Sequence, residues 1–73
     1  MTFGERMKIG MVIAGVRSGE IRRDLGINDA DISAYCTGRN VPREARRQVI
    51  LEYLENRRKG TLRALDVLEG MGL

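Results

Sequence analysis

The sequence predicts an all-helical protein, folded as one compact bundle of about five short helices over residues 1–73. Apolar residues recur three and four positions apart through most of the chain, which is the spacing of a helix with one buried side. The alternation of apolar and polar residues that marks a strand does not persist anywhere. Glycines separate the periodic stretches, and glycine commonly follows the last turn of a helix.

The first helix is expected over residues 3–16. Thr2 can cap its first turn, and Glu5 stands three positions later, where a capping box has its acid. The spacing i, i+3, i+4, i+7 predicts a buried stripe on this helix. The residues of the stripe are Ile9, Val12, Ile13 and Val16.

The next two helices are expected close together, from residue 18 or 19 to 25 and from 28 or 29 to 37. Ser18 is a favourable N-cap for the earlier helix, and Asn28 or Asp29 for the later one. Gly26 can take the left-handed conformation and so allows a tight turn between them. The predicted inward residues are Ile21 and Leu25 in the earlier helix, and Ile32, Tyr35 and Cys36 in the later one.

A fourth helix is expected from near Pro42, a favourable first residue, to near Gly60. Its predicted inward residues are Ala45, Val49, Ile50, Tyr53 and Leu54. A fifth helix over residues 61–71 would carry an apolar row formed by Leu62, Leu65, Leu68 and Met71. This row is more than a core of this size needs, and burial against a second copy would remove it from water. We therefore expect a homodimer with these four residues at the interface.

The composition excludes several classes of function. With one cysteine, Cys36, and no histidine, the chain cannot form an internal disulfide, a zinc site or a Cys–His catalytic pair. No apolar run reaches the roughly 18 residues that cross a bilayer. No converging set of acids and bases marks an enzyme. We expect a cytoplasmic protein without membrane contact, cofactor, metal ion or catalytic activity.

The segment 21–42 reads IRRDLGINDADISAYCTGRNVP and contains the turn Leu25-Gly26-Ile27-Asn28. Its DLGI, DIS and GRNVP motifs resemble the Cro/repressor (XRE-type) helix-turn-helix family of phage and bacterial regulators. The resemblance implies that residues 18–37 form a helix-turn-helix whose second helix enters the major groove of DNA. One departure is Arg22, where the family usually has a small residue. Its guanidinium must reach solvent or pair with an acid such as Asp31.

The candidate DNA contacts form two groups. The outward side of the helix expected to end at residue 37 would face base edges, with Asn28, Asp29, Ala30, Ser33 and Thr37. The stretch 37–63 holds eight basic and three acidic residues, which indicates a polyanion as partner. Its candidate phosphate contacts are Arg39, Asn40, Arg43 and Arg47. An aspartate can only accept from cytosine among the base edges, so the acid at 29 weakens the case for base recognition.

The leading interpretation is a sequence-specific DNA-binding transcriptional regulator, a repressor of phage or mobile-element type that binds double-stranded DNA as a homodimer. An alternative is a module with the same fold that has lost DNA binding and masks another regulatory protein, as an antiactivator does. The acidic residue on the base-facing side and a net charge of only +3 favour that alternative. A third interpretation is an antitoxin-like protein that binds both DNA and a protein partner.

Overall fold

The computed structural model describes the backbone of residues 1–70 and the side chains of residues 1–60 and 70. Over that range the chain is all-helical, as expected, and has no strand. Its helices are α1 (Phe3–Ala14), α2 (Ser18–Leu25), α3 (Asp29–Thr37) and α4 (Glu44–Gly70).

The expected division of the C-terminal half into two short helices is wrong. Gly60 lies inside α4, which continues without a break for 27 residues. A glycine inside a helix costs only about 1 kcal/mol relative to alanine, and the residues after it are mostly good helix formers. The expected fifth helix is therefore the last part of α4. Helix α4 also begins at Glu44 rather than at Pro42, which is buried just before it.

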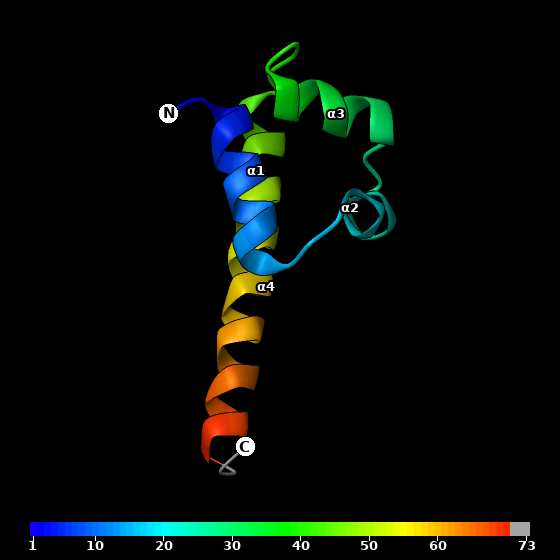
Figure 1. Ribbon diagram of the computed structural model, residues 1–73. Coiled ribbons are helices and arrows are strands. Elements are labelled where there is room, and N and C mark those ends of the chain that lie inside the picture. Colours follow the sequence, from blue (N-terminus) through cyan, green and yellow to red (C-terminus); the bar gives the residue numbers. More distant parts are fainter. Residues whose placement is uncertain (71–73) are drawn as a thin grey trace.

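Helices α1 and α4 lie side by side and run in the same direction (Figure 1). Helix α1 also packs against α3, and α2 packs against α3. The core between the helices consists of Met7, Ala14, Val16, Ile21, Ile27, Ile32, Tyr35, Ile50 and Leu54. The part of α4 that follows this core extends beyond the other three helices (Figure 1, orange to red).

The buried side of α1 is not the predicted one. Val12 is 83% exposed, and Ile9 and Ile13 are about half exposed. The buried residues are Gly4, Met7 and Ala14, which follow one another three and seven positions apart. The helix ends at Ala14 rather than at residue 16, although Val16 is buried as expected.

Gly4 provides the physical reason for this rotation of α1. A Cβ at Gly4 would lie 2.5 Å from the carbonyl oxygen of Tyr35 and 3.0 Å from that of Cys36. Only glycine allows the backbone of α1 to approach the C-terminal end of α3 so closely. With Gly4 turned toward α3, the stripe that contains Met7 and Ala14 is turned toward the core, and Ile9 and Ile13 are turned away from it.

The turns around α2 and α3 follow the sequence closely. Gly26 is left-handed, with φ 68°, and Ile27 behind it is buried. Asn28 caps α3 by accepting the backbone N–H of Asp31 at 2.8 Å. The predicted cap at Ser18 is wrong, because Ser18 is already the first helical residue.

Fewer of the predicted inward residues of α4 are buried than expected. Ile50 and Leu54 are buried, and Tyr53 is half-buried. Ala45 is exposed and Val49 is 48% exposed, so the prediction for these two residues is wrong. Both lie on the side of the helix away from Ile50 and Leu54. Within the part of the chain that the structure describes, no helix has the length and apolar character needed to cross a membrane.

Candidate nucleic-acid interface

The outward side of α3 is exposed to solvent. Asp29, Ala30, Ser33 and Thr37 are all exposed, while Ile32 and Tyr35 on the opposite side are buried. Every one of these exposed side chains is short. The helix therefore presents a slim surface that could approach another molecule without long side chains standing in between.

The acid on this surface has a cationic partner. The Nη1 atom of Arg22 lies 2.7 Å from an oxygen of Asp29, across the turn between α2 and α3. Arg22 was expected to reach solvent or to pair with an acid such as Asp31, and it pairs with Asp29. The two charges compensate each other at the N-terminal end of α3.

Asn28 and Thr37 are already partly engaged at the two ends of α3. The carboxamide oxygen of Asn28 is used by the cap, and its Nδ2 lies 3.4 Å from the Asp31 carboxylate. The hydroxyl of Thr37 donates to the backbone oxygen of Ser33 at 2.9 Å. Because the Thr37 proton is engaged, its oxygen is left to act as an acceptor.

The structure brings together only part of the predicted phosphate-binding group. Asn40 and Arg43 line one hollow beside Tyr35, between the end of α3 and the start of α4. Arg39 is exposed in the same connection. Arg47 lies elsewhere, in a hollow with Phe3 and Arg6 at the N-terminal end of α1.

Two further cations, Arg46 and Lys8, lie close to α3, and Lys8 was not predicted as a site residue. Arg46 donates from Nη1 to the Tyr35 hydroxyl at 2.9 Å and lies 3.8 Å from the Asp31 carboxylate. The Tyr35 hydroxyl raises the pKa of Arg46, with a smaller contribution from Asp31. Lys8 of α1 lines a hollow with Thr37 at the C-terminal end of α3. The position of Lys8 depends on the rotation of α1, which no local motif reveals.

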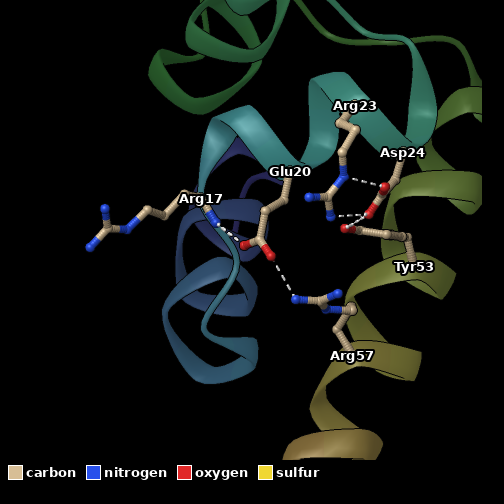
Figure 2. A network of polar contacts seen from close by, with 6 residues as sticks. All are labelled: Arg17, Glu20, Arg23, Asp24, Tyr53 and Arg57. Carbon is tan, nitrogen blue, oxygen red and sulfur yellow. Dashed lines mark hydrogen bonds and ion pairs between the residues drawn. The ribbon is translucent and has the colours of Figure 1, made fainter.

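A polar network fixes α2 against α4 (Figure 2). Glu20 accepts from the backbone N–H of Arg17 at 3.0 Å and from Nη2 of Arg57 at 2.7 Å. The Arg17 side chain points away from this cluster (Figure 2).

The second half of the network centres on Asp24. It accepts from Nε of Arg23 at 2.9 Å and from the Tyr53 hydroxyl at 2.6 Å. The hydrogen bond from Arg23, followed by that from Tyr53, lowers the pKa of Asp24 to about 2. Exposed ion pairs add little stability singly. Their effect here is to hold α2 in one orientation relative to α4, and with it the turn that leads into α3.

Cys36 is half-buried beside the core, and burial raises the pKa of its thiol. A thiol in such a place is a poor nucleophile. The predicted interface residues Leu62, Leu65 and Leu68 lie in α4, but their side chains are outside the described part, and Met71 lies outside the described residues altogether.

No family model, curated protein or solved structure matches this chain.

Proposed function

We propose that α2, the turn at residues 26–28 and α3 form a helix-turn-helix, and that the protein is a DNA-binding transcriptional regulator. The observation that carries this proposal is the exposed outer side of α3, which has only short side chains and has cationic residues near both ends. An α-helix fits the major groove of B-DNA when no bulky groups keep it away. The protein's backbone geometry supports this use because Gly26 and the Asn28 cap make the turn tight.

The charges around α3 favour a polyanion. Arg39 and Arg43 follow α3 and, within the described part of the chain, make no ion pair. Guanidinium groups bind phosphate with two parallel hydrogen bonds. The Arg22–Asp29 pair reduces the repulsion that an isolated aspartate would meet from DNA phosphates. In this proposal Arg39, Asn40 and Arg43 bind the phosphate backbone at the C-terminal end of α3.

Base recognition falls to the remaining exposed residues of α3. Thr37 has an oxygen free to accept from the amino group of adenine or cytosine, and Ser33 can donate or accept. Ala30 can contact a thymine methyl group, and Asp29 can accept from cytosine. The functional unit would be a two-fold dimer that presents two copies of α3 about one DNA turn apart. Bound to a promoter, such a dimer would act as a repressor by occlusion, as regulators of phage or mobile-element type do.

The test is binding to random duplex DNA as a function of salt concentration. We expect log affinity to fall linearly with log salt, because bound cations release counterions from DNA. Arg43→Gln should weaken binding to every sequence and reduce the slope by about 1. The matched control is Arg17→Gln, which removes the same charge at an exposed residue that precedes α2 and lies outside the connection between α3 and α4. Equal losses in the two variants would contradict the assignment of Arg43.

A protein-interaction module is the second candidate. The absence of any long hydrogen-bonding side chain on the outer side of α3, among the described residues, favours it, because family members that read bases commonly use such side chains. An absence of DNA binding at about 50 mM salt would favour this candidate over the DNA-binding regulator.

A further inference from the structure

Helices α1 and α4 line an apolar groove to which α3 contributes no residue. Its floor is formed by Ile9, Gly10 and Ile13 of α1 and by Leu51 and Leu54 of α4. Ile9 is 47% exposed and Ile13 is 53% exposed. Aliphatic side chains gathered along a groove in this way mark a surface that another apolar surface covers.

The rim of the groove carries both signs of charge. Arg6 and Arg58 line it together with Glu52 and Glu55. Glu55 and Arg58 lie 3.6 Å apart on α4. A rim of mixed sign is unfavourable for a polyanion or for an anionic membrane surface, because either would meet the two carboxylates. It is favourable for a helix that itself carries both signs.

The chain contains a helix of matching length. Residues 59–70 of α4 extend beyond the other helices, and these twelve residues span about 18 Å (Figure 1). The groove follows α4 from Gln48 to Arg58, which is about 15 Å. The sequence of the extending segment has leucine at positions 62, 65 and 68 and charged residues of both signs between them. Most helical stability in proteins comes from packing of an amphipathic side, so a packing partner would account for this continuation of α4 beyond the core.

We propose that the α1–α4 groove of one copy receives residues 59–70 of α4 from a second copy, and that the second copy receives the same segment of the first. The two α4 helices then run antiparallel and cross near Arg58, where the groove ends and the extending segment begins. Position 65 of one copy lies near the level of Leu51 in the other, since both are seven residues from the crossing. This two-fold exchange is self-complementary, as a closed dimer requires. It does not depend on DNA binding.

The first experiment is sedimentation equilibrium of the full chain at micromolar concentrations. We expect a dimer for the native sequence and a monomer for Ile13→Glu, since the carboxylate would be buried in the groove without a partner. The dimer dissociation constant should rise by at least about 100-fold. Val12→Glu is the matched control: it adds the same charge on the same helix, at a residue that is 83% exposed and does not line the groove. This control should remain dimeric, and far-UV circular dichroism should show that both variants remain helical.

The second experiment tests what occupies the groove. Leu65→Lys should also be monomeric, because it alters the extending segment and leaves the groove intact. Mixing it with Ile13→Glu should restore a heterodimer, since the native groove of one variant can receive the native segment of the other. A monomeric native protein, a dimeric Ile13→Glu variant or a mixture that stays monomeric would overturn the proposal. The assay contains no DNA, so failure of DNA binding would leave its result unchanged.

Discussion

The α2–α3 unit and the α1–α4 pair are held together in different ways. Within α2–α3 the interactions join residues close in sequence, such as the Asn28–Asp31 cap and the Arg22–Asp29 ion pair. The α1–α4 pair depends on residues far apart, such as Gly10 against Leu54. The geometry of the α2–α3 unit is therefore fixed by local interactions. The geometry of the α1–α4 pair is fixed by how the two helix surfaces pack, so its stability is more sensitive to changes in side-chain volume.

The largest expected effect tests which side of α1 is buried. Met7→Ala should lower the free energy of unfolding by about 2–5 kcal/mol, because Met7 is fully buried and its removal leaves a cavity. Val12→Ala should change it by less than about 0.5 kcal/mol, because Val12 is largely exposed. Urea denaturation measures the free energy of unfolding of both variants. Similar losses of stability in Met7→Ala and Val12→Ala would show that α1 buries a different side.

The next effect tests the close approach of α1 to α3. Gly4→Ala should cost about 1–3 kcal/mol, because the added methyl group would contact the Tyr35 carbonyl oxygen at 2.5 Å and the backbone would have to move. Gly19→Ala is the matched control, since a Cβ there meets nothing within 4 Å inside α2. That control should stabilise the protein slightly, by up to about 1 kcal/mol. If Gly4→Ala were as stable as Gly19→Ala, the close approach of α1 to α3 could not explain which side of α1 is buried.

A smaller effect is expected in the turn between α2 and α3. Gly26→Val should lower stability by about 1–2 kcal/mol, because a β-branched residue is strained at φ 68°. Thermal unfolding monitored by circular dichroism gives the shift in midpoint. Since a Cβ at Gly26 has open space around it, the loss should come from backbone strain alone, and Gly26→Asn should recover part of it. An unchanged midpoint in Gly26→Val would show that the turn tolerates any residue.

The smallest effect concerns the network that joins the two regions. The pKa of Asp24 in the folded protein is about 2, below its ordinary value of 3.8. The unfolded chain therefore binds more protons between these values, so stability is fully present above about pH 4 and falls as the pH drops toward 2. Tyr53→Phe removes one of the two hydrogen bonds that lower this pKa, and it should reduce the dependence of unfolding free energy on pH in this range. Identical pH profiles for the variant and the native protein would show that the Tyr53–Asp24 bond is not maintained in solution.

Local chemistry explains which parts of the fold the sequence could predict. The Thr2 cap, the left-handed Gly26 and the Asn28 cap each depend on atoms within a few residues. Residue types therefore predicted the cap at Thr2 and the turn at Gly26 correctly, and they narrowed the cap of α3 to Asn28 or Asp29. The outward side of α3 was predicted from the spacing of its apolar residues, and all five residues assigned to that side are exposed.

The features that the sequence did not predict depend on contacts between distant segments of the chain. On α1 the aliphatic residues outnumber the positions that the core can take, and the contact of Gly4 with α3 decides between two competing stripes. Within the candidate site, Arg43 and Arg47 look equivalent in sequence, yet one lies beside Tyr35 and the other beside Phe3. The continuation of α4 through Gly60 was missed because glycine ends helices only when the chain turns left-handed, and Gly60 does not.

The continuity of α4 has a mechanical consequence. The helix begins one residue after Arg43 and reaches Gly70 with no turn between them, so a torque applied at one end is transmitted to the other. A molecule bound to the C-terminal end of α4 would fix the orientation of the N-terminal end of α4 and of α3 beside it. Insertion of a single residue into α4 beyond Arg58 would rotate everything after it by about 100° and advance it by about 1.5 Å. The helix thus acts as a rigid lever, and its length and phase would set the separation and relative twist of the two ends.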